Sequence, residues 1–343
     1  MDAKRPTNGD VARRANVSKT TVSHVMNNTR FVSEETKRRV LLAMADLGYR
    51  PNALARSLST SKTGTIGVLI ADVSHFFFAQ VLRGIEDVLM PQGCSILICN
   101  TAESPEREKH YLDLLLRQRA AGIIAAPASP EWDILPELER HNTPVVFIDR
   151  SYETLQGPFV GVDNVKGSYL GVSHLIECGC RRLAILAGDL RLSSLRGRLD
   201  GFRQALHDHD IPLPEAWVIS GLEHVQEDLQ RLMMSDDRPS GIFCSVTSLS
   251  LMALATLHNM GLHCPEDVAL VGFDDHPWAI VSDPPLTVVR QPAREIGQAA
   301  ARILLALIGG TEHPSTRVVL DCELVVRESC GVRQRHLVQD DPV

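Results

Sequence analysis

From residue 65 onward, short apolar runs alternate with longer segments whose apolar residues recur at helical spacing. The apolar runs are nearly continuous, which is typical of parallel strands covered by helices on both faces. They lie at 66–70, 95–99, 122–125, 145–148, 159–162, 183–187, 241–244 and 269–273, and the helical segments lie at 77–91, 106–119, 165–178, 197–209, 247–260 and 294–308. This alternation predicts a doubly wound α/β fold, with enough of it for two lobes.

The first 62 residues differ in charge from the rest of the chain. They contain twelve Lys and Arg but only five Asp and Glu, a balance of +7 in a chain whose net charge is −7. The remainder therefore balances at −14. A basic segment before an acidic body indicates that the first segment meets a polyanion, and the alternative interpretation is a solvated basic face.

Three short helices are predicted within this basic segment, each after a Ser or Thr that can cap it. The caps are Thr7, Ser18 and Ser33, the second helix spans 19–26, and the third spans 34–47. Only three or four residues join the first two helices, which is the spacing of a helix-turn-helix. The residues expected to form the small core are Val11, Ala12, Ala15, Val22, Val25, Met26, Val40, Ala43, Met44 and Leu47.

The second helix carries polar residues that this core does not need. Lys19, Thr20, Ser23 and His24 lie at its N-terminal end and one turn further on. A recognition helix offers such side chains to base edges in the major groove. The alternative is a solvated polar face, and the basic charge and the tight helix spacing favour DNA.

The segment DVARRANVSKTTVSHVMNNTRFVSEETKRRVLLAMADLGYRPNALARSL resembles the DNA-binding head of the LacI/GalR family of bacterial transcription regulators. The resemblance implies that 49–58 is a hinge, that 52–58 folds into a helix on operator DNA, and that Leu58 wedges into a minor-groove step. His24 stands where many members carry Arg. The implied DNA-binding residues are Thr7, Ser18, Lys19, Thr20, Thr21, Ser23, His24, Asn27, Asn52, Ala55, Arg56 and Leu58.

The acidic body resembles the same family in TIGVLIADVSHFFFAQVLRGIEDV, VVFIDR, VGVDNVKGSYLGVSHLIECG, RLDGFRQAL, CPEDVALVGFDDHPWA and DPPLTVVRQP, in that order. This implies a periplasmic-binding-protein-like core whose two lobes are joined by three crossovers near 162–163, 289–291 and 319–321, with a small effector in the cleft. The expected divisions are a helix-turn-helix head at 1–62 and an effector-binding and dimerisation core at 63–343, with lobe one at about 63–162 and 291–319 and lobe two at about 163–289 and 321–343.

Candidates for the effector site follow the predicted strands, because ligands of α/β sheets bind beyond the carboxyl ends of the strands. By resemblance, Arg198 would bind the effector and Asp274 would be a cleft carboxylate. Trp278 is expected to be a stacking platform for a sugar. The complete set is Ser74, His75, Phe76, Phe77, Asp149, Arg150, Arg198, Val246, Thr247, Asp274 and Trp278.

Two further polar residues that follow predicted strands, Asp163 and Asp275, and Phe77 of this set have structural interpretations. Asp163 is expected to cap the helix that follows it, Asp275 to cap the turn into Pro277, and Phe77 to lie in the core as readily as in the cleft. The sequence also departs from the family at the site. His75-Phe76 stands where Asn-Pro is usual, and Val246-Thr247 stands where Asn-Asp is usual.

Motifs for catalysis, metals and membranes are not found. The sequence has no GxSxG, HExxH or phosphate-loop motif. Its eight cysteines are scattered along the chain, which indicates reduced thiols. The pair Cys178-Gly179-Cys180 is too close-set to bind zinc. The sequence His-Asp-His at 207–209 is interpreted as a solvated turn and not as a metal site. No catalytic residue, cofactor or metal is expected.

No apolar run approaches the ~18 residues of a membrane helix, and the N-terminus lacks an apolar signal segment, so a cytoplasmic protein without membrane contact is expected.

These features predict a transcription regulator, specifically a repressor that binds a near-palindromic operator as a homodimer. Its effector would be a sugar or a sugar acid of the gluconate or ketogluconate type. The alternative is a periplasmic-type sugar-binding protein without catalytic activity, which would carry a signal peptide and no basic head. An enzyme on a doubly wound sheet would carry a nucleophile or a cofactor fingerprint.

Overall fold

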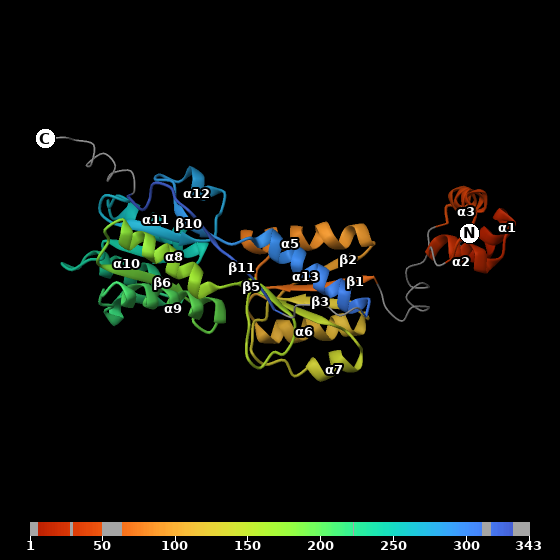
Figure 1. Cartoon of the computed structure of the whole chain (residues 1–343), viewed down its shortest axis with the longest axis horizontal. Helices are drawn as coiled ribbons and strands as arrows, with labels where there is room; N and C mark the ends of the chain where they lie inside the picture. Colours follow the sequence, from red (N-terminus) through yellow and green to blue (C-terminus); the bar gives the residue numbers. More distant parts are fainter. Residues whose placement is uncertain (1–5, 28–29, 50–63, 222, 311–316, 332–343) are drawn as a thin grey trace, which may run out of the picture. The chain divides into compact units, whose positions relative to one another are not determined.

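The computed structural model describes residues 6–27, 30–49, 64–221, 223–310 and 317–331. The chain forms two compact units, Met1–Gly64 and Thr65–Val343, each of which is described by itself below (Figure 1). Within the described residues, every helix is too short or too polar to cross a bilayer. The hinge expected at 52–58 lies outside the described residues, and with it Asn52, Ala55, Arg56 and Leu58.

In the described part of the first unit, the chain forms the helices α1 (Asn8–Ala15), α2 (Lys19–Asn27) and α3 (Glu34–Asp46). All three predicted caps are confirmed. Thr7 and Asp10 form a capping box at α1, the Ser18 hydroxyl accepts from the Thr21 amide at 3.0 Å, and the Ser33 hydroxyl accepts from the Thr36 amide. Helix α3 ends one residue earlier than predicted.

A small apolar core holds these three helices together. Val11, Val22 and Val40 are fully buried, one from each helix. Ala12, Ala15 and Ala43 are also buried, whereas Val25, Met26, Met44 and Leu47 are half-buried around them. The predicted core is therefore confirmed, with its outer members partly exposed.

The described residues of the second unit form two six-stranded sheets. The first has the order β11-β5-β4-β3-β1-β2 and is parallel throughout, and the second has the order β12-β10-β9-β8-β6-β7 and is parallel except where β12 pairs with β10. The strands of the first are β1 (Thr65–Ile70), β2 (Ser95–Asn100), β3 (Gly122–Ala125), β4 (Val145–Ile148), β5 (Phe159–Val162) and β11 (Arg317–Leu320). Those of the second are β6 (Leu183–Gly188), β7 (Val218–Ser220), β8 (Gly241–Cys244), β9 (Ala269–Phe273), β10 (Thr287–Arg290) and β12 (Glu323–Val325).

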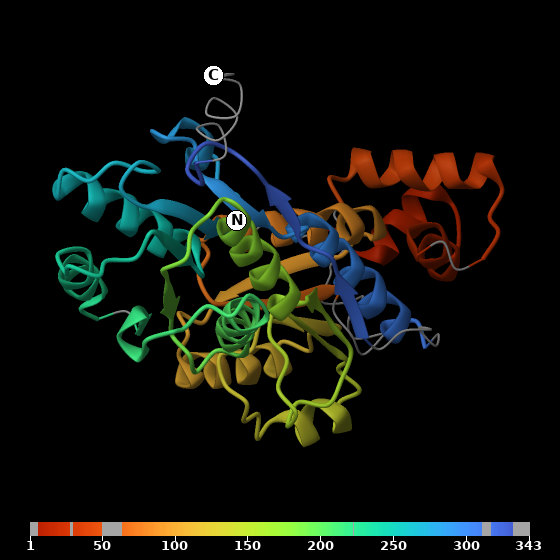
Figure 2. The ribbon, with the colours of Figure 1, turned by 60° about the vertical axis from the view of Figure 1, so that its left-hand side comes forward.

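Helices cover both faces of each sheet, as continuous apolar strands require (Figures 1 and 2). In lobe one, built on the first sheet, α5 (Phe76–Leu89) and α13 (Ala293–Ile308) pack on one face, and α6 (Pro105–Arg117) and α7 (Leu135–Arg140) pack on the other. In lobe two, built on the second sheet, α8 (Asn164–Glu177) and α9 (Ser193–Asp208) pack on one face, and α10 (Val225–Met233), α11 (Thr247–Asn259) and α12 (Trp278–Val281) pack on the other. The described residues also include two short 3-10 helices, Met90–Gln92 and Glu215–Trp217.

The chain passes between the lobes three times. It leaves lobe one after β5, returns between β10 and α13, and leaves again between β11 and β12. The doubly wound α/β fold with two parallel-sheet lobes is thereby confirmed.

Several elements of lobe one and lobe two were not predicted from sequence. They are α7, α10, α12, β7, β10, β11 and β12, all nine residues or shorter. The side chains of the edge strand β11 alternate between exposed and half-buried, so they lack the continuous apolar run that marks a central strand. Helix α9 begins at Ser193, four residues before the predicted start.

Candidate functional site

Helix α2 presents the polar residues that the sequence singled out. Ser18, Lys19 and Thr20 are exposed at its N-terminal end, while Thr21, Ser23 and His24 are partly exposed. Val22 is fully buried and fixes the helix against α1 and α3, so this polar face points away from the core. Asn27 is the last residue of the helix.

The same unit carries further exposed cations. Arg13 and Arg14 end α1, Arg30 precedes α3, and 37–39 contribute Lys and two Arg on α3. Arg14 also donates to the Asp46 carboxylate at 2.8 Å, an exposed ion pair that joins the end of α1 to the end of α3. Thr7 is exposed, and its hydroxyl donates to Asp10 at 2.6 Å. The unit thus combines exposed positive charge with an exposed polar helix end, and these two features suit binding to a DNA duplex.

In the second unit, a buried ion cluster follows β4. Asp149 adopts a left-handed backbone (φ 63°), a conformation that costs energy and concentrates at functional sites. The neighbouring Arg150 is 4% exposed, and its two terminal nitrogens donate to the Glu103 carboxylate at 2.5 Å each. Burial raises the pKa of Asp149, although the Arg150 guanidinium 3.2 Å away and Arg198 both favour its ionised form.

A second buried cluster lies in lobe two, around Arg198 of α9. Arg198 is 3% exposed; its Nε donates to Asn164 Oδ1 at 2.9 Å, and its Nη1 donates to the Ser245 carbonyl at 2.6 Å. The guanidinium lies 3.6 Å above the Phe273 ring, a cation–π contact. These three contacts, two hydrogen bonds in the guanidinium plane and one ring below it, hold the guanidinium in place.

Asp274 follows β9 and faces Arg198. It too has a left-handed backbone (φ 74°), and its amide donates to the Val289 carbonyl at 2.8 Å. Its Oδ1 accepts from Gln291 Nε2 at 2.7 Å, whereas its Oδ2 lies 3.9 Å from Arg198 Nη1. At that distance the pair attract each other without a direct hydrogen bond, so both keep the capacity to bind a polar ligand.

A cavity of about 470 Å³ adjoins Asp274 within this unit. It lies between the start of α5, the loop after β9 and the crossover at 290–293. Of the predicted effector residues, it brings together Phe76, Phe77, Thr247 and Asp274. The Phe76 and His276 rings, one from each lobe, meet with centroids 5.0 Å apart.

The remaining predicted effector residues do not line this cavity. Asp149, Arg150 and Arg198 form the buried clusters described above. Ser74 is exposed and its hydroxyl donates to Asp72 at 2.8 Å, while Val246 precedes α11 and packs against the core of lobe two. His75 precedes α5, and within the described residues its buried Nδ1 has no hydrogen-bond partner.

Trp278 and Asp275 differ from their predicted roles. The Trp278 ring packs against the apolar core of lobe two and beside His276, not along the cavity wall. Asp275 does not cap the turn into Pro277, because its carboxylate accepts two hydrogen bonds from Arg327 at 2.9 Å. Asp163 does cap α8, accepting from the Lys166 amide at 2.9 Å, as predicted. Phe77 is 6% exposed and belongs chiefly to the core of lobe one.

Four residues of these clusters lie outside the predicted effector set. Glu103, Asn164 and Ser245 hold the two arginines, and Gln291 holds Asp274. Ser245 and Asn164 follow predicted strands, at 241–244 and 159–162, and Gln291 lies in DPPLTVVRQP, so these three had a strand-end signal. The partners of Glu103, Asn164 and Ser245 lie 34 to 47 residues away in the chain, beyond the range of local patterns.

Comparison with known proteins agrees with both units. Residues 9–52 match the model of bacterial regulatory proteins of the lacI family, and 172–330 match a periplasmic binding protein-like domain. The HTH-type transcriptional repressor PurR of Aliivibrio salmonicida (strain LFI1238) is 33% identical over 324 residues, 93% of this chain and 97% of the relative.

Two solved structures are also similar. The lac repressor dimer bound to operator and the anti-inducer ONPF is 28% identical, with a TM-score of 0.83, over 95% of this chain and 99% of that one. The complex of the transcriptional regulator CelR with cellobiose is 30% identical, with a TM-score of 0.69, over 95% of this chain and 100% of that one.

A three-helix DNA-binding unit and a two-lobed binding unit on one chain define a transcriptional regulator with a small-molecule effector. The chain belongs to the lacI family of bacterial regulatory proteins.

Proposed function

We propose that this regulator is a repressor that binds a near-palindromic operator as a homodimer. The observation that carries the proposal is the exposed polar end of α2 on a basic three-helix unit. The repressor PurR, similar over almost the whole chain, and the operator-bound lac repressor dimer support it. In a dimer, two such helices enter successive major grooves, so the symmetry of the operator follows that of the protein.

Lys19, Thr20 and His24 are the side chains that we assign to base readout. The hydroxyls of Thr7 and Ser18 cap the N-termini of α1 and α2. We assign these two residues to phosphate contacts, because a helix N-terminus favours an anion. Asn52, Ala55, Arg56 and Leu58 remain part of the proposal as the minor-groove hinge. The alternative of a transport-type sugar-binding protein gives no role to residues 9–52, which match the lacI family model.

We infer that the effector is a sugar or sugar acid. Arg198 offers its Nη2, which makes no hydrogen bond within the described residues, and Asp274 offers its Oδ2. An acid group or ring oxygen would accept from Arg198, while hydroxyl groups would donate to Asp274. The similar CelR structure, a complex with cellobiose, supports a carbohydrate. Arg150 is less suited, because Glu103 already occupies both its terminal nitrogens.

Effector binding would act by changing the angle between the lobes. The lobes meet at the Phe76 and His276 rings and where the Ser151 amide donates to the Ser193 hydroxyl at 3.3 Å. Neither of these two contacts is an ion pair, so both can be exchanged at low cost when a ligand joins Arg198 and Asp274 to lobe one. The spacing of the two hinges of a dimer, and so operator affinity, would change with the angle.

Selection from random DNA tests the readout. Wild type should enrich a near-palindromic site, and Thr20→Ala should weaken binding to it by ~1–3 kcal/mol and relax preference at one position per half-site. Glu35→Ala, an exposed substitution on α3, is the control and should leave base preference unchanged. A Thr20→Ala protein with unchanged preference would remove α2 from the readout.

A thermal-shift screen tests the effector. Gluconate, ketogluconate, cellobiose, a phosphorylated sugar and a purine base form the test set. A ligand at 100 times its Kd stabilises the protein by about 2.7 kcal/mol. A shift with the purine alone would exclude the carbohydrate assignment while leaving the DNA-binding proposal intact.

A further inference from the structure

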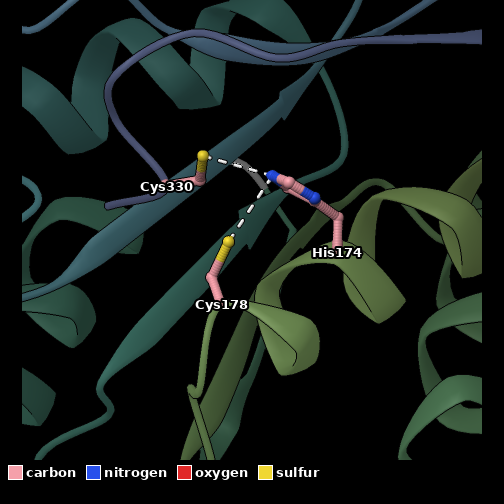
Figure 3. A group of neighbouring side chains, drawn as sticks. All are labelled: His174, Cys178 and Cys330. Atoms are coloured by element: carbon pink, nitrogen blue, oxygen red, sulfur yellow. Dashed lines mark hydrogen bonds between the residues drawn. The ribbon is translucent and has the colours of Figure 1, made fainter. Parts of the chain in front are cut away.

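A histidine and two cysteines meet in lobe two, outside the clusters around Arg198 and Asp274. His174 Nε2 lies 3.2 Å from Cys330 Sγ and 3.6 Å from Cys178 Sγ, and all three atoms lie within 4.8 Å of one another (Figure 3). The sequence did not predict this group, because 156 residues separate His174 from Cys330. Cys178-Gly179-Cys180 alone is too close-set for a zinc pair, whereas the structure brings Cys178 together with His174 and Cys330.

Two separate elements fix these side chains. His174 and Cys178 are four residues apart at the end of α8, so they share one face of the helix. Cys330 follows Ser329, whose hydroxyl donates to the Leu270 carbonyl at 2.6 Å and accepts from the Thr287 amide at 2.8 Å. The group is therefore held from the helix on one side and from the sheet on the other.

A hydroxyl group also points to the Cys330 sulfur. Thr287 Oγ1 accepts a hydrogen bond from the Arg327 amide at 2.9 Å. The Thr287 hydroxyl donates its own proton to Cys330 Sγ, 3.3 Å away. A hydroxyl donor stabilises a thiolate more than a thiol. Metal-binding side chains are commonly oriented by such outer hydrogen bonds.

We propose that His174, Cys178 and Cys330 bind a thiophilic divalent cation of the Zn²⁺ type, with a water molecule in the fourth position. Zn–S bonds of about 2.3 Å and Zn–N bonds of about 2.0–2.1 Å place tetrahedral N and S ligands about 3.5 Å apart. The two N···S distances, 3.2 and 3.6 Å, lie on either side of that value. The two sulfurs lie within 4.8 Å of each other. They therefore need to approach by at most about 1 Å to reach the S···S separation of a tetrahedral zinc site.

Charge and access fit such an ion. Two thiolates and a neutral imidazole balance a divalent cation, so no net charge is buried. Cys330 is 2% exposed, whereas His174 and Cys178 are half-buried and give the ion a path from solvent. The bound ion would tie the end of α8 to the segment after β12. It would thereby stabilise lobe two, because metal binding adds to folding free energy.

Binding is tested on the reduced, chelator-stripped full chain. Zn²⁺ should bind at one tight equivalent in competition with a chromophoric chelator, and Co²⁺ should give the thiolate-to-metal charge-transfer absorption of a tetrahedral site. Loss of a group that only orients a ligand weakens metal affinity about 10- to 100-fold. Cys178→Ser and His174→Gln remove a ligand itself, so each should weaken Zn²⁺ binding at least about 100-fold and abolish the cobalt band. Cys94→Ser, a half-buried cysteine in lobe one, is the matched control and should bind as wild type does.

Two results would overturn the proposal. One is a Cys178→Ser or His174→Gln protein that binds Zn²⁺ as tightly as wild type. The other is a wild-type protein whose cysteines are shown by mass spectrometry to be reduced, and which binds no Zn²⁺ and shows no cobalt band. A rise in Tm with Zn²⁺ for wild type and Cys94→Ser, but not for Cys178→Ser, would support it independently.

Discussion

Arg198 is both a structural residue and a candidate ligand-binding residue. Its Nε and Nη1 donate to Asn164 and to the Ser245 carbonyl, so truncation to alanine would leave a half-buried and a buried acceptor without these partners. A lysine keeps the charge but cannot present the planar fork of a guanidinium. Arg198→Lys is therefore the informative substitution.

We expect Arg198→Lys to lower effector affinity by about tenfold to a hundredfold, since a charged hydrogen bond contributes about 1.5–3 kcal/mol. Operator binding without effector should remain, because Arg198 belongs to the second unit. Calorimetry with the compound identified by the thermal-shift screen measures the change. Arg203→Lys, an exposed substitution on the same helix, should have no effect. Normal effector binding by Arg198→Lys would move the site to another part of the cleft.

Glu108 provides a pH prediction within lobe one. Burial raises the pKa of its carboxyl to about 7, although the carboxylate accepts from the Ala128 amide and Trp132 Nε1 at 2.7 Å each. The folded state thus holds a proton that the unfolded state releases above about pH 4.5. The contribution of Glu108 to the free energy of unfolding therefore falls as pH rises from about 4.5 to about 7.

Glu108→Gln does not titrate, so its comparison with wild type isolates this effect. The free energy of unfolding of wild type minus that of the variant should be larger at about pH 5 than at about pH 8. Urea denaturation at the two pH values measures both quantities. A difference that stays constant or grows with pH would show that burial does not raise this pKa.

At the scale of elements, α5 and α13 pack with their backbones in close contact. A methyl group on Gly84 of α5 would collide with the Arg294 carbonyl oxygen, and one on Gly297 of α13 would collide with the Val81 carbonyl oxygen. No side-chain movement relieves either collision, because both obstacles are backbone atoms. The two helices cover one face of lobe one and border the crossover at 290–293.

Gly84→Ala should therefore destabilise the protein, despite the better helix propensity of alanine, because the helices must separate. We expect a loss of about 1–3 kcal/mol, typical of overpacking. Thermal and urea denaturation of the variant measure it. Gly309→Ala, at a position with only ordinary contacts, should change stability by less than about 1 kcal/mol. A Gly84→Ala protein as stable as wild type would contradict the close packing.

Local signals were predictable from sequence, and long-range partnerships were not. The caps Thr7, Ser33 and Asp163 were found because a cap and its helix are adjacent in the chain. The central strands were found because they are buried on both faces. By contrast, the Arg327 partner of Asp275 and the Glu103 partner of Arg150 lie 52 and 47 residues away. Such ion pairs depend on how the lobes fold, and the residue types alone do not specify them.

At the scale of the whole molecule, DNA and effector bind to different units of one chain. The basic helices α1 to α3 form one unit, and the clusters around Arg150, Arg198 and Asp274 belong to the other. Regulation requires a coupling free energy between these units. Thermodynamic linkage makes that coupling reciprocal: whatever factor the effector applies to operator affinity, the operator must apply to effector affinity.

Two paired titrations of the wild-type full chain test the central claim that this is an effector-controlled DNA-binding regulator. Operator affinity is measured with and without the compound from the thermal-shift screen, and the affinity for that compound is measured with and without operator. We predict specific operator binding and one common factor in both titrations, within the roughly 5- to 150-fold range of known couplings. Absence of specific operator binding, or a saturating compound that leaves operator affinity unchanged, would contradict the claim.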